Sequence, residues 1–299
     1  MALAGSVPVW LIATFVVLLG LAFGSFLNVC ISRLPRHESI VQPGSRCPKC
    51  RNAIRAWDNV PVLSWMFLRG RCRVCRWRIP WRYPAVEVAT AALFLLCFLQ
   101  FGLTISSAGV AVFCFLMLGL AVMDAETMRL PNAFTWPGIG LGVVFAGITG
   151  GEIVDRLGAG FLAFGSIGTE SEVWFPLPFG LGAAVPAMLL SAFWALLAAL
   201  LILAVRWIYF AVRHREGMGL GDAKLLAMIA AWLGPQFALL SLFLGVVGAA
   251  MVGLGWMILR GRRSALTMRL PFGAFLCAAA IFAVFAGRPI LEWYLMFFR

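Results

Sequence analysis

Long apolar stretches limit what this chain can fold into more than any other feature of its sequence. A helix of about 20 mostly apolar residues crosses the hydrocarbon layer of a membrane, and helices and closed barrels are the only structures that span it. The stretches are too long and too continuously apolar for the alternating strands of a barrel. We therefore expect an all-α polytopic membrane protein with about eight transmembrane helices, at residues 7–31, 83–101, 106–123, 133–150, 180–205, 221–233, 237–259 and 270–286.

Composition and the ends of the stretches agree with this fold class. Of the 299 residues, 63% are hydrophobic and 12% are charged, whereas soluble domains are about half apolar and one quarter charged. The first stretch has no basic start and no small-residue cleavage site, so we interpret it as a retained span. The sixth stretch is too short to cross alone and is expected to begin within or just before the glycine-rich segment 217–224.

Lysine and arginine are distributed unevenly along the chain. Half of the 24 basic residues fall within 32–82, and this excess predicts a cytoplasmic loop. Eight spans then place both termini outside the cytoplasm and both Asp124 and Asp222 near the cytoplasmic face. The net charge of +12 is explained by attraction to anionic lipid head groups, so we expect membrane lipid, and no nucleic acid, among the partners.

The cytoplasmic loop contains two Cys-x-x-Cys pairs. Four thiolates from such pairs bind zinc tetrahedrally, and a reducing cytosol argues against disulfides. With four thiolate ligands the metal has no open position, so we expect structural zinc that folds a loop with little core of its own. The predicted ligands are Cys47, Cys50, Cys72 and Cys75.

Two aspartates lie at the edges of apolar stretches. Asp222 follows the glycines of 217–221, and Asp124 follows the apolar run 110–123. Two carboxylates brought together form an acid/base pair, which is sufficient to hydrolyse a peptide without a metal or a covalent nucleophile. Three alternatives remain open: Asp222 caps the helix that follows it, the two acids form the proton or cation relay of a transporter, or the chain is a zinc-loop assembly scaffold.

Two further polar residues lie near the loop. Asn28, inside the first stretch, is expected mainly to hydrogen-bond across a helix interface. Glu87, near the start of the second, is interpreted as a first-turn acid favoured by the helix dipole, or as the partner of an arginine or a polar ligand.

Together these residues resemble the bacterial type IV prepilin leader peptidase family, the membrane aspartic peptidases with a Gly-x-Gly-Asp motif. The resemblance covers most of the chain, and its segments follow the family's order. They are Gly24–Pro35, the two Cys-x-x-Cys pairs, Arg82–Glu87, Asp124–Pro131, Gly217–Lys224 with Ala231–Gly234, and Leu270–Gly273.

The resemblance implies a bifunctional enzyme of the bacterial inner membrane that serves type IV pili or type II secretion. Family members cleave the basic leader from prepilins or pseudopilins at the cytoplasmic face. They then methylate the new N-terminal amine with S-adenosylmethionine. By this resemblance the catalytic pair is Asp124 and Asp222, and the four loop cysteines bind zinc. No Gly-x-Gly-x-x-Gly cradle marks the methyl-donor site, which we expect between the loop and the first spans, with Asn28 and Glu87 as candidates.

The resemblance also suggests how the chain is divided. We expect a first transmembrane helix at 1–31, a cytoplasmic zinc-binding loop associated with methyl transfer at 32–83, and a transmembrane aspartic peptidase domain at 84–299. The segment 150–178 is longer than expected for the family, and we assign it no role.

Overall fold

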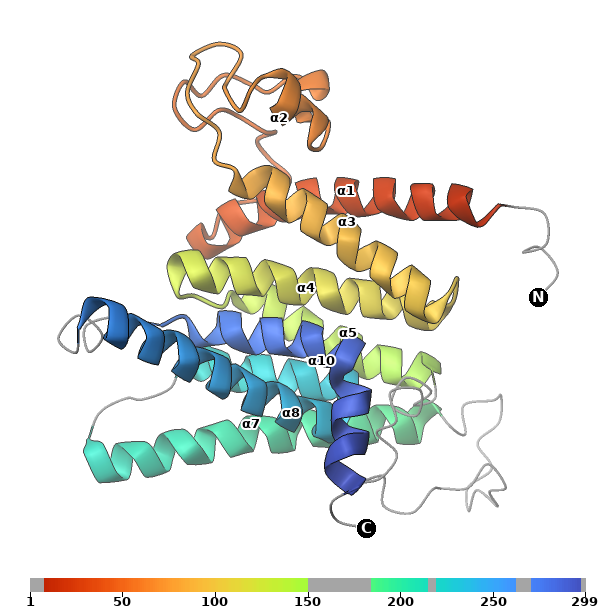
Figure 1. Cartoon of the computed structure of the whole chain (residues 1–299), viewed down its shortest axis with the longest axis vertical. Coiled ribbons are helices and arrows are strands. Elements are labelled where there is room, and N and C mark those ends of the chain that lie inside the picture. Colours follow the sequence, from red (N-terminus) through yellow and green to blue (C-terminus); the bar gives the residue numbers. More distant parts are fainter. Residues whose placement is uncertain (1–7, 150–183, 215–218, 262–269, 297–299) are drawn as a thin grey trace. The chain divides into compact units, whose positions relative to one another are not determined.

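The computed structural model describes residues 8–149, 184–214, 219–261 and 270–296, and helices make up its regular structure within these ranges (Figure 1). Contacts divide the chain into two compact units, Met1–Gly119 and Leu120–Arg299. The segment 150–178, to which the sequence assigns no role, lies outside the described residues, as do Gly217 and Met218 of the glycine-rich segment. The division by function into 1–31, 32–83 and 84–299 stays a prediction.

The first unit is built on two long helices, α1 (Val9–Arg33) and α3 (Arg82–Phe101). Small residues allow the two helix backbones to approach closely. A Cβ at Gly20 would lie 2.6 Å from the Cα of Ala91, and a Cβ at Gly24 would lie 2.6 Å from the Cα of Glu87. This is the close approach that small residues four apart permit between membrane helices.

The chain between α1 and α3 forms a small irregular loop, which we call the zinc loop (residues 34–81). It contains two short 3-10 helices, η1 (Leu34–Arg36) and η2 (Ala56–Asn59), and one short α-helix, α2 (Leu63–Phe67). In Figure 1 the loop follows the end of α1 and leads into the start of α3. So small a segment has little core of its own, so its fold depends on local turns and on what the cysteines bind.

The second unit forms around the first half of α8 (Leu220–Arg260), which is buried almost continuously from Leu225 to Gly234. Side-chain hydrogen bonds join its neighbours to it: Trp232 Nε1 donates to the Gly138 carbonyl at 2.8 Å, and Ser191 Oγ donates to the Ala231 carbonyl at 2.8 Å. The neighbouring helices are α5 (Asn132–Thr149), α7 (Ala184–Arg213) and α10 (Phe272–Met296).

The prediction of a polytopic helical membrane protein is confirmed. Six helices of the described chain are long and apolar enough to cross a membrane. One of them, α8, contains two of the expected stretches. Gly234 (φ 79°) and Pro235 form a kink between these two stretches. Together with α5, these helices contain the described residues of all eight expected stretches, except that Pro8, Leu270 and Pro271 lie just outside the helices. The third stretch lies in α4 (Ile105–Thr127), which runs from the first unit into the second. The short sixth stretch begins at Leu220, inside the glycine-rich segment as expected.

Candidate active site and metal centre

Asp124 lies in the last turn of α4, where the chain is about to reverse. The helix ends at Thr127, and Met128 takes a left-handed backbone conformation (φ 52°) while its amide donates to the Asp124 carbonyl at 2.8 Å. Pro131 then leads into α5. This turn leaves the Asp124 side chain at the end of its helix and 6% exposed.

The partner of the Asp124 carboxylate is the start of α10. The Ala274 amide donates to Asp124 Oδ2 at 2.9 Å, and the Gly273 amide also interacts with this carboxylate. A Cβ at Gly273 would lie 2.9 Å from Asp124 Oδ2, so only glycine leaves this approach open. Free amides and the positive end of the dipole make a helix N-terminus a favourable place for a carboxylate.

Asp222 lies in the first turn of α8 and is partly buried. Its Oδ2 accepts a hydrogen bond from the Gly219 amide at 3.1 Å, so Asp222 does cap its own helix. Capping occupies one oxygen of the carboxylate. Capping therefore explains why Asp222 lies at this position, but it does not exclude a second role for the side chain.

The two acids belong to one site in the second unit. Asp124 lies close enough for its charge to act on Asp222, and both acids lie close enough to act on Cys277, a fully buried residue of α10. The Leu130 side chain packs between the elements that carry them: a Cβ at Gly221 would lie 3.1 Å from its Cδ1, and one at Gly273 would lie 3.2 Å away. The end of α4, the start of α8 and the start of α10 therefore meet around two carboxylates.

Lys224 holds the start of α8 against α5. Its Nζ donates to Asn132 Oδ1 at 2.8 Å and lies 5.8 Å from the centre of the Trp136 ring. Nothing in the sequence near Lys224 indicates this contact, because Asn132 lies 92 residues away. This hydrogen bond links the start of α8, which carries Asp222, to the start of α5.

The four predicted zinc ligands come together in the zinc loop. The sulfur atoms of Cys47, Cys50, Cys72 and Cys75 all lie within 4.8 Å of one another, and the Sγ atoms of Cys47 and Cys75 are 3.7 Å apart. Tetrahedral zinc with bonds of about 2.3 Å requires sulfur atoms about 3.8 Å apart. The residues present therefore fit a four-thiolate zinc site.

Both Cys-x-x-Cys pairs form the same turn. The amide of Arg51 donates to the Cys47 carbonyl at 2.8 Å, and the amide of Arg76 donates to the Cys72 carbonyl at 3.0 Å. The two arginines also share a left-handed conformation, with φ of 55° and 57°. We call these turns the first knuckle (46–53) and the second knuckle (71–78). Their repetition presents the two sulfurs of each pair to one centre.

Without a bound metal, the thiols of Cys72 and Cys75 differ in pKa. Backbone hydrogen bonds at Cys75 and Val74 lower the pKa of the Cys72 thiol to about 7. The Trp77 amide favours the Cys75 thiolate, but desolvation and hydrogen bonds to the other three cysteines raise the pKa of Cys75 to about 11. Four sulfurs so close together become thiolates jointly when a divalent cation offsets their charge.

Glu87 ties the zinc loop to α3. It lies beyond the first turn of the helix, so the interpretation as a first-turn acid is wrong. Its Oε2 instead accepts the Val62 amide at 2.7 Å, and the side chain is 8% exposed. Val62 has a φ of 59°, a costly conformation for a β-branched residue, so this hydrogen bond holds the loop in a shape that it would not adopt by itself.

Asn28 joins α1 to α3. Its Nδ2 donates to the Tyr83 carbonyl at 2.9 Å, as expected for an amide at a helix interface. Its Oδ1 is buried and has no hydrogen-bond partner among the described residues. The structure thus brings Asn28 and Glu87 to the same pair of helices, and one polar atom there remains available.

Comparisons with known proteins agree with the resemblance. The model of the bacterial peptidase A24 N-terminal domain matches residues 18–101, and that of the type IV leader peptidase family matches residues 169–254. The chain is 34% identical to the prepilin leader peptidase/N-methyltransferase of Pseudomonas putida, over 93% of this chain and 91% of that protein. It is 30% identical to the protein of the same name from Aeromonas hydrophila, over 98% and 97% of the two chains. No solved structure is a significant match.

The matched ranges contain most of the candidate residues. The first range includes Asn28, the four loop cysteines and Glu87, and the second includes Asp222. Asp124 lies between the two ranges, within the longer similarity to the relatives.

Proposed function

This chain belongs to the type IV leader peptidase family, and from that premise we propose that it cleaves the leader peptide from prepilins and methylates the new N-terminal residue. Both activities are in the names of relatives that it matches over nearly its full length. Substrates of this class are prepilins or pseudopilins, which serve type IV pili or type II secretion.

The observation that carries the peptidase half is the meeting of Asp124 and Asp222 at the ends of their helices. In our proposal one carboxylate acts as the general base that activates a water molecule, and the other protonates the leaving amine. The Ala274 and Gly219 amides orient the two carboxylates. The glycines before Asp222 leave room for an extended peptide backbone to approach.

The position of the acids along their helices favours a peptidase over a transporter. Ion relays of transporters usually lie near the middle of the bilayer. Asp124 is in the last turn of α4 and Asp222 in the first turn of α8, so each is near a membrane face. We propose that this is the cytoplasmic face of the bacterial inner membrane, because the zinc loop carries most of the basic residues of 32–82.

For methyl transfer, we propose that S-adenosylmethionine binds between the zinc loop and α1. A groove of about 330 Å³ lies there, lined by Ala22, Ser25, Phe26, Val29, Asn59 and Pro61. Glu87 fixes the loop side of this region through Val62, and Asn28, next to Val29 in α1, has a buried carbonyl oxygen with no hydrogen-bond partner among the described residues. When bound, the cofactor supplies an electrophilic methyl group, while zinc in the four-cysteine site has a structural role.

The test is to incubate the purified membrane protein with a prepilin, with and without S-adenosylmethionine, and to measure intact mass. We expect loss of the leader in both reactions and the gain of one methyl group only with the cofactor. A protein that leaves the prepilin intact would contradict the peptidase. Cleavage without methylation would contradict the second activity alone.

A further inference from the structure

The zinc loop exposes an apolar surface that has no partner within the described chain. Leu63, Met66 and Phe67 of α2 are 53%, 62% and 84% exposed. Their spacing places them on one face of the helix. Three large apolar side chains exposed together on so short a helix usually mark a contact surface.

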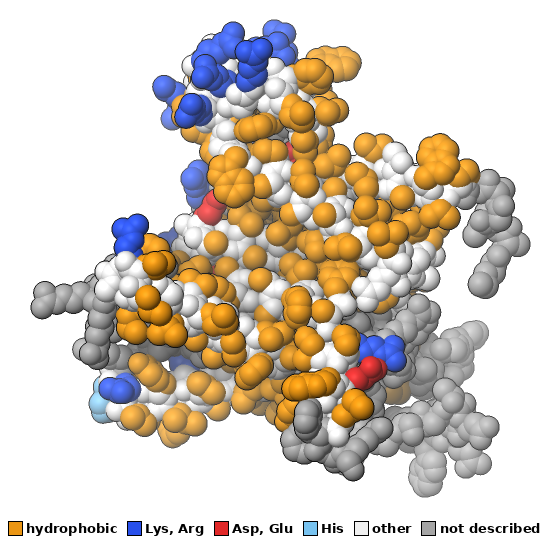
Figure 2. Space-filling model, viewed as in Figure 1, with side chains coloured by type: hydrophobic (Ala, Val, Ile, Leu, Met, Phe, Trp, Pro, Cys, Tyr) orange, Lys and Arg blue, Asp and Glu red, His pale blue; other side chains and the backbone are white. Residues whose placement is uncertain are grey.

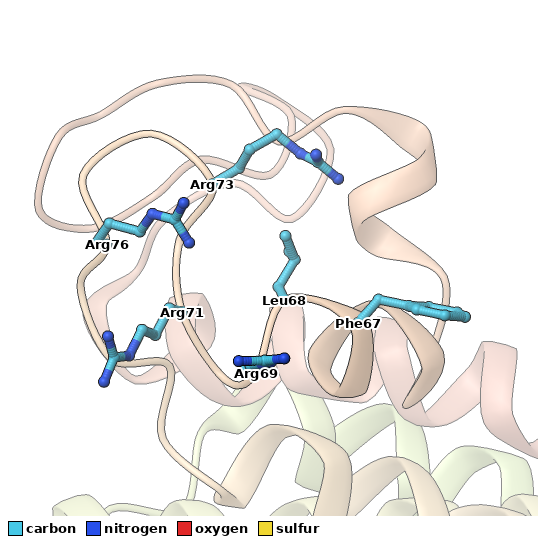
Figure 3. A pocket seen from close by; sticks show the side chains of 6 residues that line it. All are labelled: Phe67, Leu68, Arg69, Arg71, Arg73 and Arg76. Carbon is cyan, nitrogen blue, oxygen red and sulfur yellow. The ribbon is translucent and has the colours of Figure 1, made fainter.

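An arginine-lined cleft lies beside this face. Its volume is about 490 Å³, and its walls are Phe67, Leu68, Arg69, Arg71, Arg73 and Arg76. Figure 3 shows Arg71 and Arg76 on one side of the cleft and Phe67 on the opposite side. Arg73 pairs with Asp58 at 2.6 Å, whereas Arg69, Arg71 and Arg76 have no carboxylate partner among the described residues.

Charge and apolar surface are separated across the zinc loop. In Figure 2, lysine and arginine gather on its outer part, and hydrophobic side chains cover the part that adjoins α1 and α3. Both of these helices are long and apolar enough to span the membrane, so the loop is held at the membrane surface at both of its ends. At that depth an apolar face meets acyl chains and arginines meet phosphates.

We propose that the zinc loop docks on anionic phospholipid. In this arrangement the head-group phosphate occupies the cleft between Arg69, Arg71 and Arg76, and the apolar face of α2 enters the acyl boundary of the same leaflet. Guanidinium groups suit this role because they bind phosphate oxygens in pairs and remain charged. The docked loop would be more ordered in an anionic membrane than in a neutral one.

The two knuckles provide a matched control. Arg71 and Arg76 flank the second Cys-x-x-Cys pair, and Arg46 and Arg51 occupy the same positions around the first. Only the second pair of arginines lines the cleft. Arg71→Gln/Arg76→Gln and Arg46→Gln/Arg51→Gln therefore remove equal charge from equivalent positions, and only the former removes it from the proposed lipid site.

The experiment uses the full chain with bound zinc in nanodiscs of phosphatidylcholine, alone or mixed with phosphatidylglycerol. Hydrogen exchange of residues 63–81 measures order in the loop, and native mass spectrometry measures the preference for retained phosphatidylglycerol. We expect slower exchange in the anionic discs, and a preference that falls about tenfold in Arg71→Gln/Arg76→Gln but persists in Arg46→Gln/Arg51→Gln. Arg71→Lys/Arg76→Lys, which keeps the charge, should retain most of the preference. Zinc content shows that each variant is folded.

Three results would overturn the proposal. The first is an exchange rate of residues 63–81 that does not change with lipid composition. The second is an equal loss of the preference in the two Gln variants, which would indicate a general charge effect. Alternatively, inorganic phosphate added to neutral discs would protect the loop as well as phosphatidylglycerol does, which would indicate a soluble anion as the occupant.

Discussion

The Asp124 carboxylate accepts a hydrogen bond from the Ala274 amide at 2.9 Å, although 150 residues separate the two in sequence. This contact makes the start of α10 a part of the candidate active site. It also explains why glycine precedes Ala274, since a side chain at residue 273 would press on the carboxylate.

Gly273→Ala should therefore impair cleavage of the leader. A Cβ there would lie 2.9 Å from Asp124 Oδ2 and would displace the carboxylate. A misplacement of that kind lowers a catalytic rate by as much as about a hundredfold. Initial rates of prepilin cleavage measure the effect. The control is Gly255→Ala in α8, where a Cβ meets nothing within 4 Å and cleavage should be normal. Unchanged cleavage in Gly273→Ala would mean that Asp124 does not need this approach.

Removal of zinc should affect methylation more than cleavage. The four cysteines lie in the first unit, and both aspartates lie in the second. We expect Cys72→Ser to lose stoichiometric zinc and to expose the zinc loop to protease, because a structural zinc site contributes directly to folding. Zinc analysis and limited proteolysis check this, with Cys30→Ala, a buried change in α1, as the control that keeps zinc. Full methylation without zinc would contradict the dependence of methyl transfer on the zinc loop, and a loop that resists protease without zinc would contradict the structural role.

Glu87→Ala should free the zinc loop from α3. It removes the acceptor of the Val62 amide, and a hydrogen bond to a charged group contributes about 1.5–3 kcal/mol. Faster hydrogen exchange across 60–66 and lower methylation are expected, whereas Glu87→Gln, which keeps an acceptor, should preserve both. If Gln is as damaging as Ala for methylation while exchange stays slow, Glu87 contacts the methyl donor itself.

The pair of Asp58 and Arg73 should stabilise the zinc loop equally throughout the neutral range. The hydrogen bonds from Arg73 lower the pKa of Asp58 below its ordinary value. A carboxyl group whose pKa is lowered in the folded state stabilises that state fully at pH values above its ordinary pKa of about 4. This stabilisation is lost as the pH falls through the lowered pKa of the folded state. The difference in proteolytic protection between wild type and Asp58→Asn should therefore stay constant between about pH 5 and pH 8. Glu38→Gln is the exposed control. A difference that closes within this range would assign the effect to another group.

Local patterns predicted the parts of the structure that depend on neighbours in sequence. Cysteine spacing identified the four sulfurs that meet, because each knuckle is a short turn whose geometry follows from two ligands three residues apart. Apolar runs identified the helices for the same reason. They did not locate every helix end: α7 continues to Arg213, beyond the run that stops at residue 205, because hydropathy reports the depth of the bilayer and not the end of a helix.

Contacts between distant segments could not be read from the sequence. The Leu270–Gly273 motif was part of the resemblance, but nothing local indicates that its amides reach Asp124. In the same way Glu87 was interpreted through its own helix, while its partner, Val62, belongs to the loop. Both pairings arise from tertiary packing, which the hydrophobic pattern of either segment leaves undetermined.

The most direct test of the proposed dyad is the intact mass of a prepilin after incubation with wild type, Asp124→Asn or Asp222→Asn, beside a second reaction that starts from pre-cleaved pilin and S-adenosylmethionine. Asparagine keeps the size of the side chain and removes the acid/base function. We expect each variant to lose leader cleavage by about 10²–10⁴-fold and to methylate the pre-cleaved pilin normally. Cleavage that survives in either variant would show that Asp124 and Asp222 are not the catalytic pair.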